Sequence, residues 1–143
     1  MGNLPIESGT MFWHQAGAPP CDLLQIPAAK RIALGINCVS QERRIFSQLT
    51  VEENLHIARQ AVEESEAMNS SDIYRLFPQL FVLRQAKGVA LSEENQHQLA
   101  LASALVVADC YCLLHRGRNV AQGQITQFSD PLINDWWMPE TKR

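Results

Sequence analysis

The sequence predicts an α/β fold in a single domain, residues 1–143, with two long helices and a small amount of sheet. Two observations support this prediction: polar capping residues precede apolar-striped segments after Thr50 and Ser92, and two short apolar runs flank a glycine turn after Asp109. A length of 143 residues with 46% hydrophobic content suffices for one domain with a modest core.

The first long helix is predicted to begin at Val51. Thr50 stands before it and Glu53 follows three residues later, the pattern in which both side chains satisfy backbone donors at a helix start. The apolar residues that follow have helical spacing: Val51, Leu55, Ala58 and Val62. We expect an amphipathic helix whose acidic far end, residues 63–66, is a solvated face.

Two further helices are predicted before residue 108. A short one over 72–77 should stop before Pro78, because the residue before a proline is disfavoured in helical conformation. Ser92 then caps a second long helix, about 93–107, with Glu93 and Glu94 in the first turn. Its apolar stripe consists of Leu99, Ala102 and Val106.

The predicted sheet elements are short. The first thirty residues are rich in Gly and Pro and leave room only for a strand near 10–13, while 35–39 is a β-branched run bounded by Gly35. A β-hairpin is predicted over about 108–125, with its turn at Gly117. In the tail, Trp136 and Trp137 are adjacent, so at least one should be exposed as a contact surface.

Composition excludes several classes of function. With 12 basic and 15 acidic residues and a net charge of -3, nucleic-acid binding is not expected. No run approaches the roughly 18 apolar residues of a membrane span, and the first residues show no leader pattern, so a cytoplasmic protein is expected.

The cysteines and histidines predict neither a metal site nor a catalytic site. There is no CxxC pair, and no nucleophile–base pattern involves the histidines. The cysteines are expected to be reduced, buried thiols, with Cys110 and Cys112 on the same face of a strand.

One segment is specific enough to suggest a family. Residues 35–55, GINCVSQERRIFSQLTVEENL, resemble almost throughout the segment GI.yvPQ.R.iFp.LTVeENL of the ATP-binding subunits of ABC importers of the branched-chain amino acid or urea type. Weaker similarities lie at 8–12, 24–31 and 73–80. The resemblance implies that this segment contains the Q-loop and that Gln41 stands where the family's amide contacts the catalytic Mg²⁺.

A second segment resembles the family's signature motif, with a departure. Residues 91–105, LSEENQHQLALASAL, are similar to LSGGEQQMLAIARAL, so the resemblance implies nucleotide-contacting positions at Ser92 and Gln96. Both signature glycines are replaced, by Glu93 and Glu94. Two carboxylates there would repel the phosphate that this loop meets in the family.

The motifs that carry the family's chemistry do not occur in this sequence. No GxxxxGK(S/T) phosphate loop is found. Residues 108–123 resemble the family's terminal hairpin, yet only Val106 and Val107 separate it from the signature helix, where the family places the Walker B strand, the catalytic Glu, the D-loop and the switch His. The resemblance therefore implies an internal deletion, and His115, which follows it, is not the switch histidine.

Taken together, the resemblance implies a reduced P-loop-NTPase-like remnant: a single truncated nucleotide-binding-like domain with a helical subdomain at about 50–107. The family uses ATP with Mg²⁺, but no cofactor is expected for this chain, and it should not hydrolyse ATP alone. The implied partners are an ABC permease at the inner face of the cell membrane and a second nucleotide-binding subunit. The alternatives are a non-enzymatic adapter, with Trp136, Trp137 and residues 49–55 as contacts, or a non-functional fragment.

Overall fold

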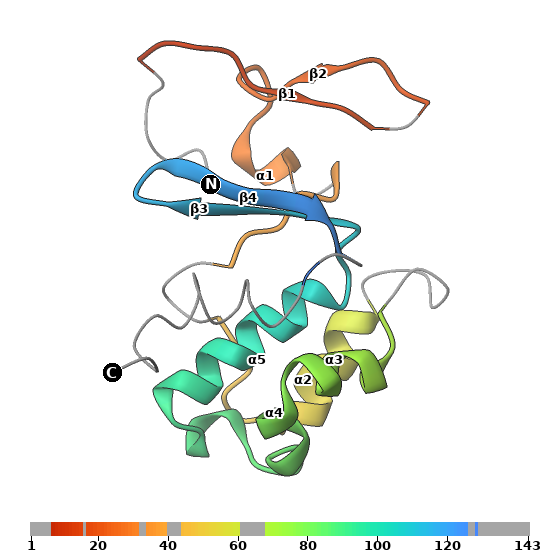
Figure 1. Cartoon of the computed structure of the whole chain (residues 1–143), viewed down its shortest axis with the longest axis vertical. Coiled ribbons are helices and arrows are strands. Elements are labelled where there is room, and N and C mark those ends of the chain that lie inside the picture. Colours follow the sequence, from red (N-terminus) through yellow and green to blue (C-terminus); the bar gives the residue numbers. More distant parts are fainter. Residues whose placement is uncertain are drawn as a thin grey trace. The chain divides into compact units, whose positions relative to one another are not determined.

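The computed structural model describes residues 7–15, 17–31, 34–39, 44–60, 68–125 and 128. The chain divides into two compact units, Met1–Cys38 and Val39–Arg143. Figure 1 shows the helices and strands of both units.

The first unit contains a minimal hairpin and one helical turn. Strands β1 (Phe12–Trp13) and β2 (Cys21–Asp22) pair in antiparallel fashion, and helix α1 spans Ala28–Arg31. The Arg31 guanidinium donates a hydrogen bond of 2.8 Å to the carbonyl oxygen of Leu23, which ties α1 to the end of the hairpin. β1 confirms the strand predicted near 10–13.

The second unit is built on helices. They are α2 (Val51–Arg59), α3 (Ser70–Leu76), α4 (Pro78–Val82), the 3-10 helix η2 (Gly88–Ala90) and α5 (Glu93–Leu105). α3 ends immediately before Phe77 and Pro78, as the sequence predicts, and Pro78 then opens α4, a position where the missing N–H costs nothing. The helix starts predicted after Thr50 and Ser92 are confirmed.

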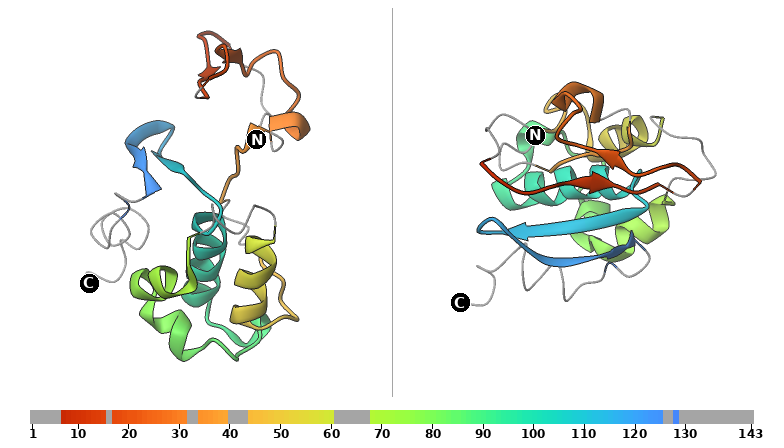
Figure 2. Two further views of the ribbon diagram at one scale, coloured as in Figure 1. Left: turned by 90° about the vertical axis from the view of Figure 1, so that its right-hand side faces the viewer. Right: turned by 90° about the horizontal axis from the view of Figure 1, so that it is seen from above.

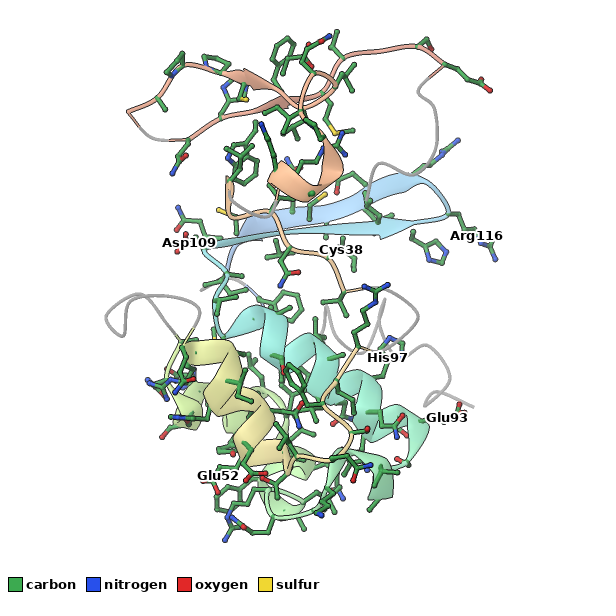
Figure 3. The ribbon with its side chains drawn as sticks, turned by 180° about the vertical axis from the view of Figure 1, so that it is seen from behind. Cys38, Glu52, Glu93, His97, Asp109 and Arg116 are labelled. Atoms are coloured by element: carbon green, nitrogen blue, oxygen red, sulfur yellow. The ribbon has the colours of Figure 1, made fainter. Side chains whose placement is uncertain are left out.

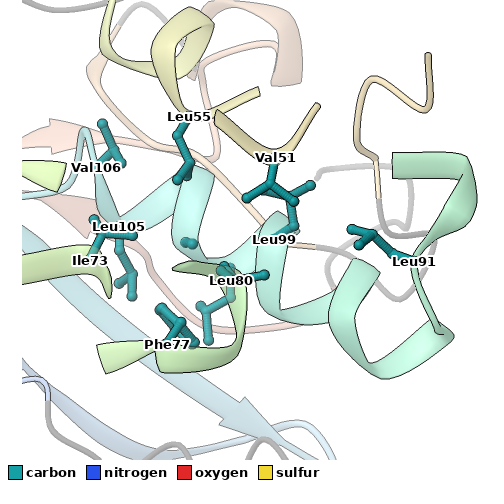
Figure 4. Close-up of a cluster of buried hydrophobic side chains, with 11 residues drawn as sticks. Val51, Leu55, Ile73, Phe77, Leu80, Leu91, Leu99, Leu105 and Val106 are labelled. Carbon is teal, nitrogen blue, oxygen red and sulfur yellow. The ribbon is translucent and has the colours of Figure 1, made fainter. Parts of the chain in front are cut away.

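The core of this unit lies between α2, α3, α4 and α5 (Figure 4). Four of its side chains have 0% of their surface exposed: Val51, Ile73, Leu80 and Leu99. Val106 is 1% exposed. The stripe predicted on α5 is confirmed, because Leu99, Ala102 and Val106 are buried. Of the stripe predicted after Thr50, Val51 and Leu55 are buried, Ala58 is half-buried, and Val62 lies outside the described residues. Burial of these side chains is the main stabilising term for the four short helices, which would be marginal in isolation.

A β-hairpin follows α5. Strands β3 (Cys110–His115) and β4 (Arg118–Gln124) pair in antiparallel fashion, with a register irregularity between Leu113 and Leu114. Arg116 and Gly117 form the turn with φ of 49° and 75°. Both values lie in the left-handed region that two-residue hairpin turns require, and glycine adopts it without strain.

Some sequence-based expectations are wrong. No strand forms over 35–39: Gly35 adopts a φ of 80° in a turn after α1, where the Ile36 N–H donates to the carbonyl of Arg31, and residues 36–39 are irregular. The cysteines are not buried: Cys38, Cys110 and Cys112 are exposed and Cys21 is half-buried.

Other expectations concern parts of the chain outside the described residues. These are the acidic end of the first long helix, the tail with Trp136 and Trp137, and Gln41. In the segment 49–55, predicted to supply contacts of an adapter, Val51, Asn54 and Leu55 are buried, whereas Glu52 and Glu53 are exposed. Within the described part of the chain, no helix has both the length and the apolar character that crossing a membrane requires.

Candidate functional site

The start of α5 brings together the predicted site residues Ser92 and Gln96. The Ser92 hydroxyl oxygen accepts a hydrogen bond of 3.2 Å from the backbone N–H of Asn95 and so caps the helix. The Gln96 amide nitrogen donates to the carbonyl oxygens of Gly88, at 3.1 Å, and Leu91, at 3.3 Å. Gln96 thus holds the loop that leads into α5.

Glu93 and Glu94 form the first turn of α5, and both are exposed. Figure 3 shows Glu93 at this end of the helix, far from Asp109 at the other end. Carboxylates in a first turn interact favourably with the helix dipole, which explains why the helix tolerates them. The same charges make this end of α5 electrostatically unfavourable for an anion.

Two loops lie side by side next to this helix start. Backbone hydrogen bonds join 47–52 to 84–89: Gly88 N–H to the carbonyl of Leu49 (2.9 Å) and Val89 N–H to that of Ser47 (2.8 Å). Val51 N–H bonds in turn to the carbonyl of Ala86 at 3.0 Å. Thr50 and Lys87 form an isolated antiparallel bridge. The segment that precedes α2 and the segment that leads to Ser92 are therefore one hydrogen-bonded unit.

At Gly88 the two loops approach each other closely. A Cβ atom there would lie 3.0 Å from Ile45 Cδ1, 3.1 Å from Ser47 Cα and 3.2 Å from the Phe46 carbonyl oxygen. Two of these neighbours are backbone atoms, which cannot rotate away. Only glycine fits without a shift of one loop.

Asn54, on the first turns of α2, is the other anchor of the loop unit. It is a buried polar residue with 3% of its surface exposed. Its Oδ1 accepts from the Phe46 N–H at 2.8 Å, and its Nδ2 donates to the carbonyls of Phe46 (3.0 Å), Thr50 (2.8 Å) and Leu49 (3.3 Å). Burial of this amide is tolerated because its polar atoms are satisfied.

The start of α2 is fixed by a reciprocal pair of bonds. Thr50 N–H donates to Glu53 Oε2 at 2.7 Å, and Glu53 N–H donates to Thr50 Oγ1 at 3.2 Å. This capping box confirms the sequence prediction. The hydrogen bonds from Thr50, first its backbone N–H and then its side chain, lower the pKa of Glu53 below its ordinary value.

The structure thus brings together Ser92 and Gln96, whereas Gln41 lies outside the described residues. Sequence reasoning missed Asn54 and Gly88 as anchors. A signal for Asn54 was present, since asparagine is a poor helix former and stands among apolar positions of α2. No comparable signal marked Gly88, because the atoms that leave no room for a side chain at this position belong to residues 45–47, which are distant in the sequence.

The passage from α5 to the hairpin is direct. α5 ends at Leu105 and β3 begins at Cys110, so only residues 106–109 connect them. In Figure 2 the last helix leads straight into the first strand of the hairpin. Met68 N–H donates to the carbonyl of Val106 at 2.9 Å, and Ile125 N–H to that of Asp109 at 2.7 Å, so both ends of this connection are hydrogen bonded.

Known proteins similar to this chain are ATP-binding proteins of ABC transporters. A probable branched-chain amino acid transport ATP-binding protein LivF of Archaeoglobus fulgidus is 33% identical over 106 residues, which cover 73% of this chain and 43% of that protein. An uncharacterized ABC transporter ATP-binding protein of Rhizobium meliloti is 30% identical over 115 residues, 79% of this chain and 41% of the relative. No family model matches.

The chain therefore belongs to the family of ABC transporter ATP-binding proteins. Within that family, the similarity extends to a relative named for branched-chain amino acid transport. The chain spans less than half the length of these two relatives, 43% and 41%. The resemblance predicted from residues 35–55 and 91–105 is confirmed at the level of the family.

Proposed function

We propose that this chain is an ATP-binding-subunit-like component of an ABC importer of the branched-chain amino acid or urea type, and that by itself it does not hydrolyse ATP. The direct passage from α5 to β3 is the observation that supports the lack of ATP hydrolysis. In the family, the Walker B strand, the catalytic Glu and the switch His stand between these elements. Residues 106–109 leave no place for them.

The phosphate-binding chemistry also argues for an inactive chain. Phosphoryl transfer depends almost entirely on positioning and electrostatic stabilisation of the phosphates. No GxxxxGK(S/T) loop occurs among the 143 residues, and Glu93 and Glu94 occupy the positions of the two signature glycines. We propose the Q-loop role for Gln41 and a degenerate signature for Ser92 and Gln96, with ATP and Mg²⁺ as the family's cofactors.

The arrangement around α5 supports this assignment of roles. Ser92 and Gln96 are both used to build the helix start, since one caps the helix and the other holds the preceding loop. The residues that shape the signature segment are thus retained, while the residues that would approach a phosphate are changed. Such a pattern fits a segment that keeps its conformation and has lost its ligand.

The proposed partners are those of the family: an ABC permease subunit and a second nucleotide-binding subunit. In this proposal, a single truncated nucleotide-binding-like domain uses its helical subdomain, about 50–107, to dock on the permease from the cytoplasmic side. Three large apolar side chains of this subdomain are at least half exposed, Phe81 50%, Val82 68% and Val89 60%, and Phe46, in the loop before it, is 57% exposed. Exposed apolar groups of this kind support a protein-binding role.

Calorimetric titration with MgATP tests the inactive state. The full chain, shown by circular dichroism to be folded, should give no binding heat at micromolar ATP, whereas the Archaeoglobus fulgidus relative titrated in the same buffer serves as the positive control. Micromolar binding by this chain would overturn the proposal. A nucleotide-independent, stable self-complex at low concentration would favour the adapter function instead.

A further inference from the structure

Cys110 and Cys112 lie on the exposed face of β3. Cys110 is opposite Gln124 and Cys112 is opposite Gln122, so these four side chains share one face of the hairpin. All four residues are exposed, whereas Tyr111, Leu113, Ala121 and Gly123 of the other face are half-buried. The outer face therefore presents two thiols in a neutral polar setting.

The spacing keeps these thiols from joining to each other. Residues two apart on a strand are separated by about 6.6 Å along it. A disulfide needs Cβ atoms about 3.5–4.5 Å apart, so the pair could close one only with a distortion of the strand. Both cysteines are free in the structure.

A metal ion placed between the sulfur atoms spans the gap that a disulfide cannot. Two collinear metal–sulfur bonds, each about 2.3 Å as in zinc sites, would separate the sulfur atoms by about 4.6 Å, a separation that rotation of the two side chains can reach. Among the described residues, no group of three or more His, Cys, Asp or Glu is placed to hold a metal ion. The site thus supplies two ligands, too few for tetrahedral zinc.

We propose that Cys110 and Cys112 form a two-coordinate thiolate site for a soft monovalent cation, Cu(I). Thiolates select such soft ions, and a two-ligand linear geometry matches the two sulfur atoms available. The neighbouring Gln122 does not compete for the ion, because its amide oxygen accepts a hydrogen bond from the Asn119 side chain at 2.6 Å. This inference does not depend on the proposed transport function.

Binding exchanges protons for the metal and involves no change of oxidation state. Each thiol gives up its S–H proton to solvent, and two Cu–S bonds form. The resulting complex of Cu⁺ with two thiolates carries one net negative charge.

Anaerobic Cu(I) titration of the full chain against a chromophoric Cu(I) chelator tests the site. We expect one equivalent of Cu(I) to bind, and Cys110→Ser and Cys112→Ser each to weaken binding at least tenfold, because even the loss of an outer-shell partner of a metal site costs about 10- to 100-fold. Cys21→Ser and Cys38→Ser, which leave both strand thiols in place, are the matched controls and should leave the affinity unchanged.

Alkylation mapping adds a readout that does not depend on folding of the variants. One equivalent of Cu(I) should protect Cys110 and Cys112 of the unaltered chain from N-ethylmaleimide at least tenfold more than Cys38, as judged by mass spectrometry of peptides. Equal protection of Cys38, or an affinity that neither single substitution on β3 lowers, would overturn the proposal.

Discussion

The side-chain amide of Asn54 bonds to both backbone polar groups of Phe46: Oδ1 accepts from its N–H at 2.8 Å, and Nδ2 donates to its carbonyl at 3.0 Å. Both hydrogen bonds go to the backbone of Phe46, whereas its side chain is 57% exposed. Asn54, on the helix that follows, therefore anchors the loop before α2, in addition to the backbone hydrogen bonds that Ser47 and Leu49 accept from the 84–89 segment.

Replacement of Asn54 should be among the most damaging substitutions of a polar residue. Asn54→Leu leaves the Phe46 N–H and three carbonyls without this partner and is expected to lower the free energy of unfolding by about 2–3 kcal/mol. The measurement is urea denaturation followed by circular dichroism. Asn119→Leu on the exposed hairpin is the control and should cost within about 0.5 kcal/mol; an equal loss in both variants would contradict the anchoring role.

Stability should fall in acid partly through Glu53. Its folded pKa lies below the ordinary value of 4.5, so its contribution is present above that value and is lost as pH falls through the lowered folded pKa. Glu53→Gln keeps a side-chain acceptor at this position without the titratable group. Urea midpoints measured from pH 7 downward should show a smaller acid loss in Glu53→Gln than in the unaltered chain, and parallel curves would exclude the effect.

Gly88→Ala should destabilise the loop unit by crowding. The new methyl group would stand about 3 Å from backbone atoms of Ser47 and Phe46, and overpacking of this kind costs about 1–3 kcal/mol. Thermal unfolding provides the measurement. The adjacent Val89→Ala, at a residue 60% exposed, is the control and should change stability by less than about 0.5 kcal/mol.

Leu99→Ala should open a cavity at the centre of the helical core. Leu99 has 0% of its surface exposed and packs in the cluster that α2, α3 and α4 share with α5, so a loss of about 2–5 kcal/mol is expected. Leu114→Ala, at a side chain 67% exposed on β3, is the size-matched control. Equal midpoints in urea for the two variants would mean that this cluster is not the stabilising core.

Sequence reasoning located the elements whose determinants are local. The α2 and α5 starts depend on Thr50 and Ser92 with residues three positions away, and the hairpin depends on a turn between neighbouring strands. The strand predicted at 35–39 failed because a β-branched run forms a strand only with a partner strand. Gly35 instead ends the turn after α1.

The candidate site was predictable only in part. Ser92 and Gln96 were predicted as site residues through motif similarity, and that role stays a prediction, whereas their hydrogen bonds to Asn95, Gly88 and Leu91 required coordinates. Asn54 and Gly88 both contact the loop before α2, and Gly88 is distant from that loop in the sequence. A property that depends on two segments meeting in space cannot be deduced from either segment alone.

The hairpin of β3 and β4 joins strands that are consecutive in the chain, and this has a consequence for folding. Its pairing needs closure of only a short loop, so it can form in microseconds without waiting for the helices. Its attachment to the helical core passes through Ile125 and Phe128, with the Phe128 ring 5.0 Å from that of Tyr111. We therefore expect the hairpin to open and to exchange its amide protons more readily than the core helices.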